Sequence, residues 1–164
     1  MVALVGEAVC VKISGRANFS LSIDFKRLVM EMAGRGYSRF IFDLSECVLM
    51  DSTFLGVLAG IALRFFDPKI TDDQYLVELL NPNPRIADLL ENLGIAHLFK
   101  IQNRGPDCVF TPVAAEAASR VEVTRNCLEA HRTLMSISPE NIGKFKEVTQ
   151  FLAQDLKKME KPSS

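Results

Sequence analysis

Residues 40–61 read "FIFDLSECVLMDSTFLGVLAGI" and define the central unit of the fold. The unbroken apolar run at 40–42 is typical of a strand with both faces covered. The polar triplet at 51–53, Asp-Ser-Thr, stands directly before a long apolar segment. Such a triplet marks the start of a buried helix, because its side chains can satisfy the first backbone N–H groups. The stretch therefore predicts a strand, a connection and a buried helix that begins at about Ser52.

Upstream and downstream segments extend this unit into an α/β domain. Two β-prone runs flank Gly6-Glu7, where a glycine suits a type II′ hairpin turn. Apolar residues at helical spacing predict a helix that starts at Asn18 or Ser20 and ends at Gly34 or Gly36. Further along, we expect a strand at 72–80, a helix capped by Asn83 with Pro84 in its first turn and Gly94 after its end, and a last strand at 96–101. The order ββαβαβαβ predicts a mixed sheet covered by helices.

From residue 112 the composition becomes rich in alanine and prone to form helix. A first helix is expected over 112–137, and a second one begins after Ser138 as N-cap and Pro139 in the first turn. The second helix carries one apolar stripe, formed by Ile142, Phe145, Val148, Phe151 and Leu152. We therefore predict a domain at 1–111 and a C-terminal helical hairpin at 112–164.

Composition excludes several classes of protein. The 164 residues are 48% hydrophobic and carry a net charge of −1, so direct binding of nucleic acid is not expected. No secretory signal is expected at the start of the chain. The apolar segment at 54–66 is too short to insert in a membrane, and its Gly56 and Gly60 suggest a close approach of helix to sheet. The cysteines Cys10, Cys47, Cys108 and Cys127 lack metal-ligand spacing, which favours reduced thiols in a cytoplasmic protein without metal or other cofactor.

The stretch at 40–61 resembles the signature of STAS domains, the fold of bacterial anti-sigma factor antagonists. The matching residues are Asp43-Leu44-Ser45, then Asp51-Ser52, then Leu55-Gly56-Val57-Leu58. In that family a strand ends at the first of these motifs and a short loop follows; we likewise expect Asp43 to end its strand by turn chemistry. The resemblance covers about residues 1–111 and extends to the helix after them. One departure is Phe54, which stands where the family commonly has glycine.

The resemblance implies a non-enzymatic regulator that switches partners. An unphosphorylated antagonist binds an anti-sigma factor, a serine kinase of the ATPase type; phosphorylation of the antagonist separates the two, and a phosphatase resets the system. Carried over here, Ser52 is the phosphoacceptor. Asn18, Phe19, Asp51, Thr53 and Phe54 are the candidate partner-binding residues. Homo-oligomerisation through the C-terminal hairpin is a further expectation.

Other interpretations stay open at this point. Ser52 can serve as a helix cap, Asn18 and Phe19 can form a cap with a hydrophobic staple, and Phe54 can belong to the core. The domain can be a scaffold or transporter-associated subunit that binds its partner without phosphorylation, or a small-molecule sensor. An enzyme has the least support, because His97 and His131 have no nucleophile at a recognisable catalytic spacing and are expected to be structural or surface residues.

Overall fold

The computed structural model describes residues 1–65, 69, 76–105, 110–113 and 116–161. They form a five-stranded sheet in the order β1-β2-β3-β4-β5, in which β1 is antiparallel to β2 and the other neighbours are parallel. The strands are β1 (Val2–Val5), β2 (Ala8–Ala17), β3 (Arg39–Met50), β4 (Val77–Leu80) and β5 (Lys100–Gln102). The helices are α1 (Phe19–Gly34), α2 (Ser52–Arg64), α3 (Pro84–Asn92), α4 (Arg120–Ile137) and α5 (Glu140–Glu160). The predicted mixed α/β sheet with a C-terminal helical hairpin is confirmed.

Local signals in the sequence correctly predicted several ends of strands and helices. Gly6 has a φ of +61°, and Glu7 has no positive φ, as a type II′ turn between β1 and β2 requires. The Asn18 side chain caps α1, and the Asn83 side chain caps α3. Gly94, just past α3, has a φ of +69°, the left-handed conformation common after helix ends.

Strand β3 is longer than the sequence predicted. It runs to Met50, so the expected loop before α2 is absent and Asp51 alone connects strand to helix. The expectation that Asp43 ends the strand is wrong, because Asp43 pairs with both Lys12 and Leu80 inside the sheet. Its Oδ1 accepts the Ser45 N–H at 3.0 Å, which is local turn chemistry within a strand. The register of β2 against β3 shifts at this point, and pairing then resumes.

Three further expectations need correction. The segment predicted as the last strand opens with a 3-10 helix, η2 (Ala96–Leu98), and only Lys100–Gln102 pair. Helix α4 starts at Arg120, after a Ser119 cap, and the described residues of 112–119 are not helical. The Ser138 side chain does not cap α5, which starts after Pro139 without a side-chain cap. Of the strand expected at 72–80, residues 77–80 are confirmed, and 72–75 lie outside the described residues.

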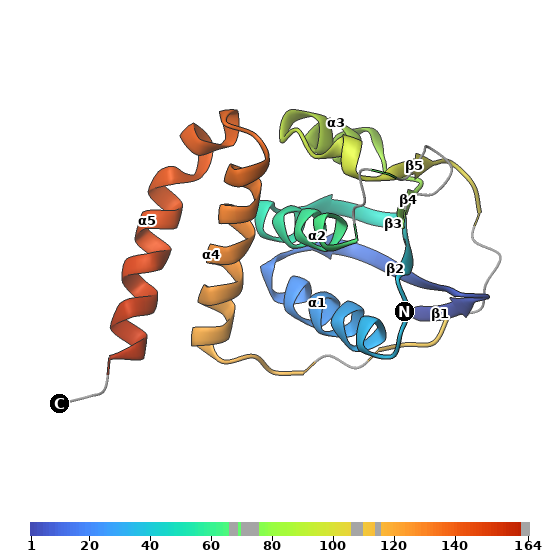
Figure 1. Ribbon diagram of the computed structural model, residues 1–164, viewed down its shortest axis with the longest axis horizontal. Helices are drawn as coiled ribbons and strands as arrows, with labels where there is room; N and C mark the ends of the chain where they lie inside the picture. Colours follow the sequence, from blue (N-terminus) through green and yellow to red (C-terminus); the bar gives the residue numbers. More distant parts are fainter. Residues whose placement is uncertain (66–68, 70–75, 106–109, 114–115, 162–164) are drawn as a thin grey trace.

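The helices form two groups. Helices α1, α2 and α3 lie along one face of the sheet, and α4 and α5 run antiparallel beside them, with α5 outermost (Figure 1). The main core lies under the first group and includes Phe40, Phe42, Leu44, Phe54 and Leu58, all 0% exposed. Helix α4 packs on both α1 and α2. The C-terminal hairpin therefore packs on its own domain.

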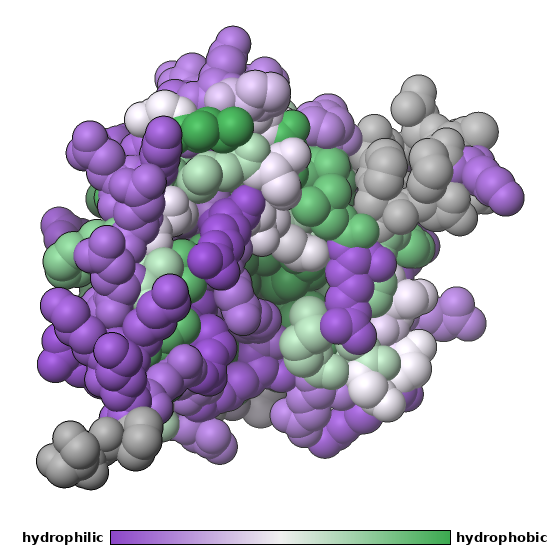
Figure 2. Space-filling view, turned by 60° about the vertical axis from the view of Figure 1, so that its left-hand side comes forward, coloured by the Kyte–Doolittle hydropathy of each residue, from purple (hydrophilic) through white to green (hydrophobic). Residues whose placement is uncertain are grey.

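The apolar stripe expected on α5 is only partly buried. Phe145 packs against the main core, and Leu152 is half-buried. Ile142, Val148 and Phe151 are exposed, and Phe151 reaches 67%. Figure 2, which turns the side of α4 and α5 toward the viewer, shows a largely hydrophilic surface with hydrophobic residues near its middle.

The structure describes three of the four cysteines, and all three are thiols. Cys10 and Cys47 are buried thiols, Cys127 is partly buried, and Cys108 lies outside the described residues. No helix in the described part of the chain combines the length and the apolar character needed to cross a membrane.

Candidate phosphoacceptor site

The carboxyl ends of β2 and β3 meet at one edge of the sheet. The two strands stay paired up to Ala17 and Met50, and the Asp51 N–H donates to the Ala17 carbonyl at 3.0 Å. Helices α1 and α2 begin directly after these strand ends. The fold thereby brings together candidate site residues that lie far apart in the sequence.

Asp51 joins the starts of the two helices. Its Oδ1 accepts the Phe54 N–H of α2 at 2.8 Å, and its Oδ2 accepts the Phe19 N–H of α1 at 2.7 Å. One carboxylate thus satisfies free N–H groups in the first turns of both helices. The cap of α2 is Asp51 and not Ser52, which is the first residue of the helix.

Asn18 and Phe19 lie on the surface beside Asp51. Asn18 Oδ1 accepts the Leu21 N–H at 3.1 Å, so Asn18 caps α1 while it remains exposed. The Phe19 side chain is 46% exposed. An exposed aromatic ring next to polar groups is the composition typical of protein interfaces.

The Ser52 side chain is partly exposed and makes a long-range contact with α4. Ser52 Oγ lies 2.9 Å from Nε2 of His131, a residue 79 positions further along the chain. The other ring nitrogen, Nδ1, lies 2.6 Å from the Cys127 carbonyl oxygen. A carbonyl only accepts, so Nδ1 carries a proton. In the neutral imidazole Nε2 is then the acceptor, and the Ser52 hydroxyl donates to it.

This pair corrects one expectation from the sequence, that His131 has no serine as a partner. His131 is 5% exposed, as a structural residue would be, and its ring contacts Ser52. The Phe145 ring of α5 lies edge-on to the imidazole, with ring centroids 5.0 Å apart. His131 therefore lies between α2 and α5, and each of its ring nitrogens has a hydrogen-bond partner.

Thr53 and Phe54 are both buried, at 5% and 0% exposed. Phe54 stacks on Phe25 with centroids 5.0 Å apart, so it belongs to the core and presents no surface to a partner. The Thr53 hydroxyl faces Cys127 of α4. Burial raises the pKa of the Cys127 thiol; the Thr53 hydrogen bond opposes this, and the negative charge of Asp51 adds to it.

A glycine sets the distance between α2 and α4. A Cβ atom at Gly56 would lie 2.3 Å from the Ala130 carbonyl oxygen, closer than any side chain permits. At Gly60 the nearest atom is Thr133 Cγ2, at 3.8 Å. The glycine spacing therefore serves a contact between two helices, and not the helix-to-sheet contact expected from the sequence.

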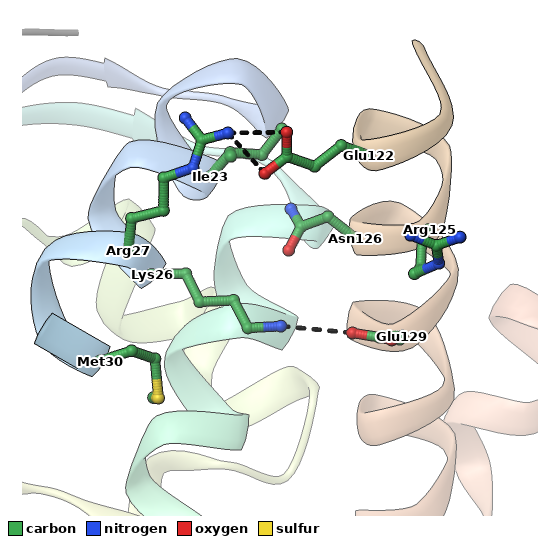
Figure 3. Close-up of a pocket in the computed structure, with 8 residues that line it drawn as sticks. All are labelled: Ile23, Lys26, Arg27, Met30, Glu122, Arg125, Asn126 and Glu129. Atoms are coloured by element: carbon green, nitrogen blue, oxygen red, sulfur yellow. Dashed lines mark hydrogen bonds and ion pairs between the residues drawn. The ribbon is translucent and has the colours of Figure 1, made fainter. Parts of the chain in front are cut away.

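Helix α4 is also held on α1. Arg27 Nη2 donates to both carboxylate oxygens of Glu122 at 2.6 Å, and Lys26 Nζ lies 3.2 Å from Glu129 (Figure 3). Between these pairs the Asn126 amide donates to Ser22 Oγ at 2.9 Å. All of these residues except Ser22 line a cavity of about 250 Å³. The contact of one arginine nitrogen with both carboxylate oxygens and the bond of the buried amide together fix the register of α4.

The turn between α4 and α5 is fastened to α3. The Asn141 amide donates to the carbonyls of Leu93 and Leu134, both at 2.8 Å, and Asn141 is 0% exposed. Lys144 Nζ donates to the Asn92 carbonyl at 2.9 Å. These bonds satisfy carbonyls at the ends of α3 and α4. In the described part of the chain no three potential ligand side chains gather into a metal site.

Comparisons with known proteins agree with this architecture. A family model described as the STAS domain matches residues 1–107. No curated protein sequence matches the chain at a significant level. The fold is similar to that of a candidate anti-sigma factor antagonist, TM1081 from Thermotoga maritima, with 21% identity, a TM-score of 0.55 and coverage of 63% of this chain and 86% of that one. It is also similar to the anti-sigma factor antagonist SpoIIAA in its unphosphorylated form, with 16% identity, a TM-score of 0.50 and coverage of 65% and 89%. The chain belongs to the STAS domain family.

Proposed function

We propose that this chain is a non-enzymatic regulator of the anti-sigma factor antagonist type, with Ser52 as its phosphoacceptor. Its partners are an anti-sigma factor or a serine kinase of the ATPase type, and a phosphatase, in the bacterial cytoplasm. The observation that carries the proposal is the position of Ser52. It is partly exposed at the start of α2, next to the exposed Asn18 and Phe19. The partner surface comprises Asn18 and Phe19, with Asp51 and Ser52 between them and α4.

The local electrostatics support a switch that acts at the interface. A phosphoserine carries about −1.5 to −2 charges, which the N-terminus of a helix accommodates. The Asp51 carboxylate already binds two N–H groups there, so the phosphate adds like charge beside it. Because the N-terminus of α2 favours negative charge, phosphorylation should leave the fold intact. It should weaken binding, because a partner would have to desolvate a dianion.

Quantitative capture of partners from the native host tests this proposal. Wild type and Ser52→Asp would serve as baits, and Ser38→Asp as matched control, since Ser38 is exposed just before β3 at the opposite edge of the sheet. We expect an ATPase-type kinase with wild type and Ser38→Asp, and its loss with Ser52→Asp. Equal capture by all three baits would contradict the proposal.

A second candidate function is a scaffold or transporter-associated subunit that binds its partner without phosphorylation. The observation in its favour is the outer face of α5, where Phe151 is 67% exposed and Val148 is 44% exposed. On this proposal residues 1–111 form the STAS-like domain, and 112–164 are an extension that attaches to a partner or to a second copy of the chain. Phe151→Glu should then abolish complex formation, and Ser52→Asp should have no effect. The reverse pattern selects the first proposal.

A further inference from the structure

We propose that His131, in the C-terminal extension, is the general base that takes the hydroxyl proton of Ser52 when this serine is phosphorylated. The inference rests on the proposed function and assigns a role to a residue outside the matched family region, 1–107. The contact that carries it is the 2.9 Å distance between Ser52 Oγ and His131 Nε2. A base must lie within about 2.6–3.2 Å of the atom that it deprotonates.

The tautomer of His131 is set by its own helix. The Nδ1 proton is directed to the Cys127 carbonyl, at 2.6 Å, one turn earlier in α4. This bond leaves the Nε2 lone pair directed at the Ser52 hydroxyl. Orientation of a base by a second hydrogen bond is the arrangement that activates serine nucleophiles. Here a backbone carbonyl provides it.

The surroundings keep the imidazole in place. The Phe145 ring of α5 packs edge-on against it, and α4 meets α2 in close contact at Gly56 and Ala130. The titratable groups at this corner are the Asp51 carboxylate, bound to the N–H groups of Phe19 and Phe54, and the Cys127 thiol beside Thr53.

The proposed step conserves atoms and charge. Ser52 Oγ attacks the terminal phosphorus of a nucleoside triphosphate bound to the partner kinase. The Oγ–P bond forms, the bond from that phosphorus to the bridging oxygen breaks, and nucleoside diphosphate leaves. The Oγ proton passes to His131 Nε2. The imidazolium then faces the new phosphoserine, and a charge-assisted hydrogen bond between them keeps α4 docked.

A fluorophosphonate probe tests the base without the kinase. Ser52 Oγ would displace fluoride from phosphorus, and His131 would take the same proton. Mass spectrometry of the tryptic peptide 40–64 would locate the label and measure its rate of formation. We expect labelling of Ser52 in the wild-type chain, and none at this site in Ser52→Ala.

Variants of His131 separate basicity from packing. His131→Gln retains a hydrogen-bond acceptor but cannot take the proton, so labelling should slow by about 100-fold or more. Added imidazole should restore the rate in His131→Ala and leave His131→Gln unchanged. A wild type without label at Ser52, or equal rates in wild type and His131→Gln, would overturn the proposal.

A measurement on the wild type covers the case in which these variants do not fold. The ring 15N chemical shifts of His131 should show a proton on Nδ1 and a lone pair on Nε2; the opposite tautomer would overturn the proposal. The probe also separates this inference from the proposed function. If Ser52 is unmodified in the host but probe labelling depends on His131, the proposed function fails, and His131 still acts as the base that activates Ser52 toward phosphorus. If Ser52 is phosphorylated in the host but labelling ignores His131, the base assignment alone fails.

Discussion

The Asp51 carboxylate accepts the backbone N–H of Phe19 at 2.7 Å and thereby joins the first turn of α1 to the first turn of α2. The same side chain caps α2 through Phe54. Because one residue organises both helix starts, it also fixes where Asn18, Phe19 and Ser52 stand relative to one another. The partner surface that we propose depends on this one carboxylate.

Replacement of Asp51 should therefore destabilise the domain more than the loss of an ordinary cap. A single cap is worth about 1 kcal/mol, and Asp51 serves two N–H groups, so Asp51→Ala should lower the free energy of unfolding by about 2 kcal/mol. Asn18→Ala, which removes the cap of α1 alone, should lower it by about 1 kcal/mol. Urea denaturation of both variants measures the two values. Equal losses would show that the bond to Phe19 contributes nothing.

The two glycines of α2 should respond oppositely to alanine. A Cβ at Gly56 would overlap the Ala130 backbone, so Gly56→Ala should cost about 3 kcal/mol or more and loosen α4. Gly60→Ala meets only the Thr133 side chain, at 3.8 Å, and should be neutral or stabilising by up to about 1 kcal/mol. Urea denaturation and hydrogen exchange along α4 would measure both effects. A Gly56→Ala protein as stable as the wild type would contradict the close α2–α4 contact.

The two phenylalanines near Ser52 should have different roles: Phe54 should contribute to stability and Phe19 to partner binding. Phe54 is fully buried against Phe25, so Phe54→Ala should lower the free energy of unfolding by about 3–5 kcal/mol. Phe19 is 46% exposed, so Phe19→Ala should leave stability within about 0.5 kcal/mol of wild type while it weakens partner capture. Thermal melting and capture of the kinase would report the two properties. Unchanged capture by folded Phe19→Ala would remove this ring from the proposed surface.

The sequence predicted the fold well because its signals are local. Gly6, Asn18, Asn83 and Gly94 each act within a few residues, and all four stand where their chemistry requires. Strand β3 was predicted too short, because the Asx hydrogen bond of Asp43 also occurs within a strand when neighbouring strands supply the pairing. That pairing comes from distant segments and leaves no local pattern.

The sequence predicted only part of the candidate site. The triplet at 51–53 marked the helix start, but the second role of Asp51, as acceptor of the Phe19 N–H, depends on the packing of a segment 32 residues away. His131 lies 79 residues from Ser52, and no spacing rule joins the two. The one signal for the packing of α4 on α2 was the glycine at position 56, which indicated a close approach but was assigned to the sheet instead of to α4.

The Cys127 thiol gives a prediction for pH dependence. Burial raises its pKa above that of a free thiol, so the folded state holds this proton more tightly than the unfolded chain. The stabilisation is fully present below the unfolded value of about 8.5 and is lost as the pH rises through the raised folded value. Urea denaturation under reducing conditions should show this loss in the wild type and a smaller one in Cys127→Ser. Identical slopes against pH would contradict it.

Asn141 should hold the C-terminal hairpin against α3. Asn141→Ala leaves the Leu93 carbonyl without the Asn141 donor and leaves the Leu134 carbonyl with only the long 3.4 Å bond from the Ser138 N–H, which should cost about 2–3 kcal/mol and speed hydrogen exchange in α5. The matched control is Lys144→Ala, which removes an exposed bond to Asn92 and should cost less than about 0.5 kcal/mol. Unchanged exchange in α5 of Asn141→Ala would show that other contacts hold the hairpin.

Phosphosite mapping of the protein purified from its native host tests the central claim most directly. The tryptic peptide 40–64 contains three hydroxyl residues, Ser45, Ser52 and Thr53. Fragment ions that divide the peptide between residues 45 and 52 and between 52 and 53 separate them. We predict phosphate on Ser52, its absence from Ser45 and from the buried Thr53, and a kinase-type partner bound only to the unphosphorylated fraction. Phosphate confined to another residue, or a partner bound equally to both fractions, would contradict the claim.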